Sequence, residues 1–139
     1  MKVSQTIAVS VSSVLFLGMM TLSTGLALAR SGGGGEVRLI AKMMTGAASG
    51  KADYRERGNR KRLNVEAEDL PPGTRTSQTV FVNDMQVGIM TLEPCPVATQ
   101  LLCGELELNT QDGQSVPAGI MADKSVKIGT VLSGTLGPK

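Results

Sequence analysis

The chain has 139 residues and carries 14 lysine and arginine side chains against 12 aspartate and glutamate side chains, a formal net charge of +2. This near balance favours neither an acidic nor a basic partner for the chain as a whole. The sequence contains no histidine, which excludes catalysis by a histidine base, histidine-ligated zinc and pH switching by histidine. Any enzyme would have to use carboxylates, lysines, Tyr54 or the two cysteines.

Residues 1–29 have the features of a secretory signal peptide. One early positive charge, Lys2, precedes a long apolar and hydroxyl-rich stretch that ends in small residues at Ala27 and Ala29. This pattern predicts cleavage after Ala29 and a secreted or periplasmic protein. The alternative is an apolar stretch that is retained as a membrane anchor. No later apolar run approaches membrane length, so the mature chain is predicted to contain no membrane span.

A glycine tract, Gly32–Gly35, follows the predicted cleavage point and indicates a flexible linker over residues 30–35. The remaining residues, 36–139, have the length of one ordinary domain. Their charge is unevenly distributed, because residues 30–75 hold 10 basic and 6 acidic side chains whereas residues 76–139 hold 3 and 6. The first part of the domain is therefore expected to present a basic surface.

Apolar residues recur at every second position in most of the segments after residue 36. Leu63, Val65 and Ala67, for example, alternate with polar side chains, and turn-forming pairs such as Gly58-Asn59 separate the segments. The pattern predicts strands near 36–44, 50–57, 60–68, 77–82, 86–93, 101–109, 124–128 and 130–135. We therefore expect an all-β domain, a single antiparallel β-sandwich of Greek-key type with about eight short strands, or else a small barrel.

The segment around Gly58-Asn59 predicts a hairpin with a two-residue turn. In that register Arg57 pairs with Arg60 and Arg55 with Arg62 on the outer face, while Tyr54 pairs with Leu63 on the inner face. Two directly opposed pairs of like charge cost stability, which makes an anionic polymer that offsets the repulsion a candidate partner. Arginine suits sulfate, phosphate or carboxylate groups, so polysaccharide, lipopolysaccharide or nucleic acid are the expected ligands. The alternative is a solvated hairpin tip that keeps the edge of the sheet soluble.

Cys95 and Cys103 are the only cysteines, and they enclose the short loop PVATQLL. A thioredoxin-type redox pair follows the pattern Cys-x-x-Cys, and a structural zinc site needs four ligands. Neither pattern is present in this sequence. In an exported chain, a single pair that closes a short loop predicts a disulfide, which would hold the loop between two strands.

Paired acids occur at Glu66, Glu68 and Asp69 and again at Glu105 and Glu107. Glycosidases use paired carboxylates, but acids two residues apart share one face of a strand. A solvated polar face explains these acids better than a catalytic pair.

Two further features of the sequence concern possible metal binding. The segment LNTQDGQS offers oxygens of Asn109, Asp112 and Ser115 to calcium, but it lacks the acidic density of an EF-hand loop and is better explained as an Asp-Gly turn. The methionines after residue 30 form no Met-x-Met or Met-x-x-Met cluster for copper, and we interpret them as core filler and surface scatter. We therefore expect neither a metal nor a cofactor.

Four runs, GKADYRERGNRKRLNVEAEDLPPGT, VFVNDMQVGIMTL, GELELNTQDGQSVP and TVLSGTL, resemble a group of small secreted bacterial domains of unassigned function. The resemblance covers residues 36–136. The order of strands and turns is also similar, more distantly, to copper/zinc superoxide dismutase and to the chordin-type domain, which are both β-sandwiches. This likeness implies a Greek-key sandwich. It implies no dismutase activity, because the histidines that hold the metals in that family are missing here.

The sequence as a whole favours an exported, non-enzymatic module with a structural or binding role in the cell envelope or extracellular space. Its partner is left open between an anionic polymer and another envelope protein. The first alternative is polyanion binding through Arg55, Arg57, Arg60 and Arg62, and the second is an enzyme with carboxylate chemistry. A cleft with converging acids would indicate the enzyme, whereas a contiguous basic face would indicate the binding protein.

Overall fold

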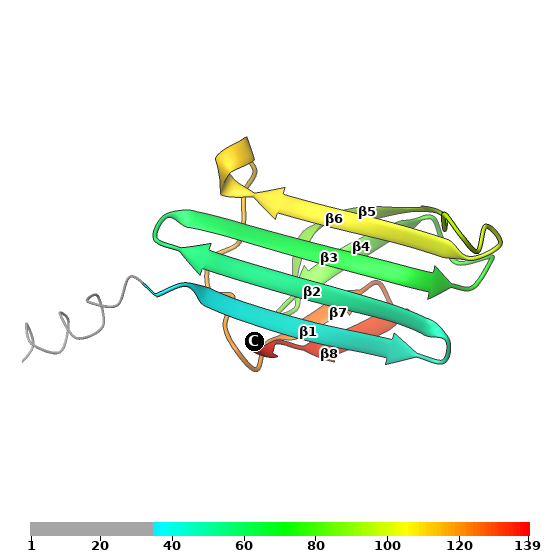
Figure 1. Cartoon of the computed structure of the whole chain (residues 1–139), viewed down its shortest axis with the longest axis horizontal. Helices are drawn as coiled ribbons and strands as arrows, with labels where there is room; N and C mark the ends of the chain where they lie inside the picture. The colour runs from blue at the N-terminus through cyan, green and yellow to red at the C-terminus, as the bar shows by residue number, and fades with distance from the viewer. Residues whose placement is uncertain (1–34) are drawn as a thin grey trace, which may run out of the picture. The chain divides into compact units, whose positions relative to one another are not determined.

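The computed structural model describes residues 35–139 and shows nine strands, most of them joined by short turns, with a longer loop between β6 and β7 (Figure 1). The strands are β1 (Val37–Thr45), β2 (Ala48–Arg57), β3 (Arg60–Leu70), β4 (Ser77–Val82), β5 (Met85–Pro94), β6 (Leu102–Asn109), β7 (Ser125–Ile128), β8 (Leu132–Thr135) and β9 (Gly137–Pro138), with a short 3₁₀ helix, η1 (Thr110–Asp112), after β6. The predicted signal peptide and all but the last residue of the predicted linker lie outside the described residues. Within residues 35–139 no helix has the length and apolarity to cross a membrane.

The strands form one antiparallel sheet in the order β8-β7-β4-β5-β6-β3-β2-β1-β9. The sheet curls so that its two ends lie side by side. At this closure β8 packs against β1, and the chain continues from β8 into β9, which pairs with β1 through Leu39 and Ile40. The predicted all-β antiparallel fold is confirmed. The observed structure differs in detail from the predicted sandwich of two separate sheets, because its single sheet is continuous and nearly closed, like a barrel.

The alternation of apolar residues places the core inside the curled sheet. Leu63, Val65 and Ala67 of β3 are buried, as are Ala52 and Tyr54 of β2. Aliphatic side chains and methionine fill most of the remaining interior, with Met43 and Met90 buried and Met44, Met85 and Met121 exposed. The loop from η1 to β7 adds Val116 and Ile120 to this cluster.

A glycine allows the two ends of the sheet to approach closely. A Cβ atom added at Gly134 of β8 would lie 2.6 Å from the backbone oxygen of Lys42 in β1. Real Cβ atoms do not come so near to a backbone oxygen, so any larger residue at position 134 would push β8 away from β1.

Cys95 and Cys103 form a disulfide at the loop between β5 and β6, with their Cα atoms 5.0 Å apart. The backbone N–H of Cys95 also donates to the carbonyl oxygen of Leu101, at 2.9 Å. β5 and β6 are paired only next to this loop, through residues 92–94 and 102–104. The predicted disulfide is therefore present, and it lies where the β4–β5 part of the sheet joins the β6–β3 part.

Candidate anion-binding site

The hairpin of β2 and β3 has the register that its turn residues predict. Arg57 lies opposite Arg60, Arg55 opposite Arg62, and Tyr54 opposite Leu63. Gly58 takes a φ of 59° at the first turn position, a conformation that glycine adopts without strain. Because side chains alternate between the faces of a strand, the four arginines share the outer face, and all four are exposed.

The four arginines line a single depression of about 150 Å³ at the tip of the hairpin. The other residues that line it are Lys61, Asn109 and Gln111. We call these seven residues the arginine depression. None of them is a carboxylate, so the four arginines concentrate positive charge in the depression, which offers donors from guanidinium and amide groups.

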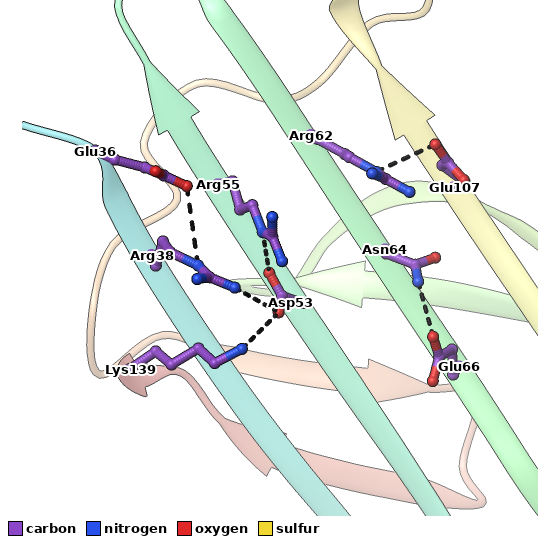
Figure 2. A network of polar contacts seen from close by, with 9 residues as sticks. All are labelled: Glu36, Arg38, Asp53, Arg55, Arg62, Asn64, Glu66, Glu107 and Lys139. Carbon is purple, nitrogen blue, oxygen red and sulfur yellow. Dashed lines mark hydrogen bonds and ion pairs between the residues drawn. The ribbon is translucent and has the colours of Figure 1, made fainter.

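Carboxylates outside the depression engage two of its arginines (Figure 2). Nε of Arg55 lies 3.2 Å from Oδ1 of Asp53, and Nε of Arg62 lies 3.2 Å from Oε1 of Glu107. Both arginine side chains are nearly half exposed, at 46% and 49%, so each pair contributes at most about 1 kcal/mol. These ion pairs offset part of the repulsion between Arg55 and Arg62.

Asp53 is the centre of the larger network in Figure 2. Its Oδ2 atom lies 3.8 Å from Nη2 of Arg38 and 3.7 Å from Nζ of Lys139, in addition to the contact of Oδ1 with Arg55. One carboxylate is thus shared among three cations. Arg57 and Arg60, in contrast, make no ion pair within residues 35–139, so the uncompensated charge lies at the tip of the hairpin.

The end of β6 and η1 bring two amide side chains, those of Asn109 and Gln111, to the depression, which the sequence did not reveal. Oγ1 of Thr110 accepts a hydrogen bond from the N–H of Lys61 at 3.0 Å and thereby fastens η1 to β3. Oδ1 of Asn109 accepts from the N–H of Gln111 at 3.0 Å. This oxygen therefore caps η1, whereas the sequence had raised it as a calcium ligand. Asn109 reaches the depression because it pairs with Arg62. Predicting this position would have required the strand order.

The predicted acidic pairs lie on the same outer face, farther from the tip. Glu66 of β3 lies opposite Glu105 of β6, and Oε1 of Glu66 accepts from Nδ2 of Asn64 at 2.9 Å. Asp69 lies near the disulfide, where its carboxylate and the two sulfur atoms are within 4.8 Å of one another. Both sulfurs are committed to the disulfide, so the carboxylate is the one remaining metal ligand of this group.

A wider hollow of about 640 Å³ lies between the turn at residues 71–75, β4 and the turn at residues 129–131. The residues that line it are Pro71, Pro72, Gly73, Thr74, Arg75, Ser77, Gln78, Thr79, Phe81, Gly129, Thr130 and Val131. None of them is a carboxylate, so this hollow does not bring acids together.

Tyr54 belongs to the interior and takes no part in the arginine depression. Its side chain is 1% exposed, and its hydroxyl donates to Oε2 of Glu56 at 2.5 Å. Burial, with the hydrogen bond to Glu56 and the charge of Glu56 adding to it, raises the pKa of Tyr54 well above its usual value. The other aromatic side chain of residues 35–139, Phe81, is on β4, so the outer face of the hairpin carries no stacking surface.

No protein-family model, curated protein or solved structure matches this chain. The resemblance to small secreted bacterial domains therefore stays a prediction.

Proposed function

We propose that this protein is an exported, non-enzymatic binding module of the cell envelope or extracellular space that binds anionic groups of a polymer in the arginine depression. One observation carries the proposal: four arginines of one hairpin face line one depression without a carboxylate, and two of them, Arg57 and Arg60, make no ion pair within residues 35–139.

The chemistry of the depression suits sulfate, phosphate and carboxylate groups. Planar guanidinium groups donate two parallel hydrogen bonds to such anions, and the side-chain amides of Asn109 and Gln111 can donate further bonds. The cations are exposed, so binding is expected to be mainly electrostatic and to weaken as salt rises above physiological ionic strength, where charges are screened over about 8 Å. The arginine depression itself contains no carboxylate, which favours the binding of anions there.

The test is retention of the mature protein on an immobilised sulfated polysaccharide. We expect retention at low salt and elution as the salt concentration rises. The double variant Arg57→Gln, Arg60→Gln should bind about tenfold more weakly at low salt, because two exposed charge contacts of roughly 0.5–1 kcal/mol each are lost. The free energy of unfolding of the same variant should be unchanged or higher by about 0.2–1 kcal/mol, because one opposed pair of like charges is removed.

A matched control removes two lysines that line none of the hollows on the hairpin. Lys42 of β1 is exposed and Lys124 precedes β7, so Lys42→Gln with Lys124→Gln removes the same charge. This control should retain near-normal binding. Equal losses in both double variants would assign binding to net charge alone, and a protein that is not retained even at low salt would refute the proposal.

A further inference from the structure

The arginine depression is the first of three hollows that follow one another along the outer face of β2 and β3. The second, of about 200 Å³, is lined by Lys51, Asp53, Arg55, Arg62, Asn64 and Glu66. The third, of about 140 Å³, is lined by Ser49, Gly50, Lys51, Glu66 and Glu68. Because each hollow shares two residues with the next, they form one groove along the hairpin, which we call the hairpin groove.

The charge of this groove changes sign along its length. The arginine depression contains four arginines and no acid, and the second hollow mixes cations with Asp53 and Glu66. In the third hollow, Lys51 is the one cation beside Glu66 and Glu68. Glu105 of β6 lies directly opposite Glu66 and adds to this acidic end. A polymer with uniform negative charge would therefore be attracted at the tip and repelled at the other end.

The middle of the groove is close to neutral. Asp53 is shared among Arg38, Arg55 and Lys139, and Glu107 is paired with Arg62 (Figure 2). Asn64 supplies an uncharged amide between them. The groove is therefore complementary to an extended ligand that carries anionic groups at the end on the arginine depression, an uncharged stretch in the middle and cationic groups at the other end.

We propose that the hairpin groove binds an extended peptide segment of a partner protein in one direction, with acidic residues on the arginine depression and basic residues on Glu66, Glu68 and Glu105. This inference rests on the proposed function, because it uses the same arginines. The opposed pairs of the hairpin recur every two residues, at about 6.6–6.8 Å, which is also the repeat of alternate side chains in an extended peptide. The distance from Arg57 to Ser49 is about 27 Å on the same scale, the span of about nine extended residues.

A single-stranded nucleic acid fits the groove less well. Such ligands carry a uniform negative charge and stack their bases on aromatic side chains. Within residues 35–139 the aromatic residues are Tyr54, which is buried inside the sheet, and Phe81, which lies on β4. The groove provides neither the uniform charge nor the stacking surface.

Three fluorescein-labelled peptides test this direction of binding by fluorescence anisotropy at low salt. The block peptide has the sequence Asp-Ser-Asp-Ser-Gly-Ser-Lys-Ser-Lys, the permuted peptide exchanges one Asp with one Lys, and the acidic peptide has Asp in place of both Lys residues. We expect the block peptide to bind about two- to tenfold more tightly than the permuted peptide, since two exposed charge contacts differ between them.

Two double variants separate the ends of the groove. Arg57→Gln with Arg60→Gln should weaken both the block and the acidic peptide. Glu66→Gln with Glu68→Gln should weaken the block peptide but strengthen the acidic peptide, because a repulsion is removed. Glutamine at position 66 keeps an amide oxygen that can accept from Asn64, so the local hydrogen bond is retained.

The outcomes distinguish this inference from the proposed function. If the Glu66→Gln, Glu68→Gln variant changes binding of both peptides in the same direction, or if block and permuted peptides bind equally, the inference is overturned while anion binding at the tip stands. If the protein binds neither the acidic peptide nor a sulfated polysaccharide, the proposed function fails, and the inference fails with it.

Discussion

Tyr54 is a buried polar residue whose environment changes the pKa of its hydroxyl group. The phenol is buried, and its hydroxyl donates to Glu56, so the pKa of Tyr54 is raised well above the value of about 10 that a tyrosine has in an unfolded chain. The folded state therefore holds the phenolic proton more tightly than the unfolded state does. The resulting stability is fully present below pH 10 and is lost as the pH rises above it.

We predict that Tyr54 does not ionise near pH 10 while the protein stays folded. It is the single tyrosine of the chain, so ultraviolet absorbance of the phenolate reports this residue alone. The free energy of unfolding should fall by up to about 1.4 kcal/mol for each pH unit above 10. In the Tyr54→Phe variant, this contribution to the fall of the free energy of unfolding above pH 10 should be absent. A normal phenolate titration with an unchanged circular dichroism spectrum would contradict the prediction.

Arg57 and Arg60 differ from Arg55 and Arg62 in a way that residue type cannot show. All four sit in the same register and face, but Asp53 and Glu107 engage only the second pair. The repulsion expected from the sequence is therefore concentrated at one opposed pair, at the turn. This difference is why the binding test substitutes Arg57 and Arg60.

At the scale of elements, the disulfide loop joins two strands that share little pairing. β5 and β6 are hydrogen-bonded only beside the loop, because β5 then follows β4 while β6 follows β3. The bond between Cys95 and Cys103 closes a ring with a sequence separation of 8. Loop-closure entropy assigns about 2.5 kcal/mol to a ring of this size.

We predict that Cys95→Ala with Cys103→Ala lowers the free energy of unfolding by about 2.5 kcal/mol, measured by urea denaturation. Reduction of the unsubstituted protein should give a similar loss, which separates the cross-link from the packing of the sulfur atoms. The oxidised protein should have no thiol that can be alkylated before reduction. Alkylation of both cysteines in the native protein isolated from its host, before reduction, would contradict the assignment.

At the scale of the whole described domain, the last residues of the chain close the sheet. Leu136 is buried, and its backbone N–H donates to the oxygen of Lys124 at 2.9 Å while its own oxygen accepts from Asp123 at 2.8 Å. Beyond it, β9 pairs with β1, and Lys139 donates from its backbone to Arg38. The open edge of β1 is thus covered by the C-terminal segment.

We predict that Leu136→Ala lowers the free energy of unfolding by about 2–5 kcal/mol, because it leaves a cavity at the point of closure. Thr135→Ala, at the exposed neighbouring position, is the matched control and should change it by less than about 0.5 kcal/mol. Both values come from urea denaturation. Equal effects of the two substitutions would show that closure at Leu136 does not stabilise the fold.

The sequence by itself determined the features that depend on near neighbours. Alternating apolar residues predicted the eight longer strands to within a few residues, and the Gly58-Asn59 turn predicted the hairpin register. Both signals are local, because side chains alternate along any strand and a two-residue turn aligns the strands that it joins. The strand β3 extends past its predicted end because Asp69 takes a φ of 56° where the pairing with β6 shifts, and no turn residue signals that irregularity.

The tertiary structure alone decided which distant strands lie side by side. The pairing of β3 with β6 brings Glu107 to Arg62 and brings Asn109 to the arginine depression, and the pairing of β9 with β1 closes the sheet. These contacts join residues far apart in the chain, and any strand with one apolar face can pair with several others. Strand order is therefore fixed by how all the apolar faces are buried together, which is a property of the whole fold.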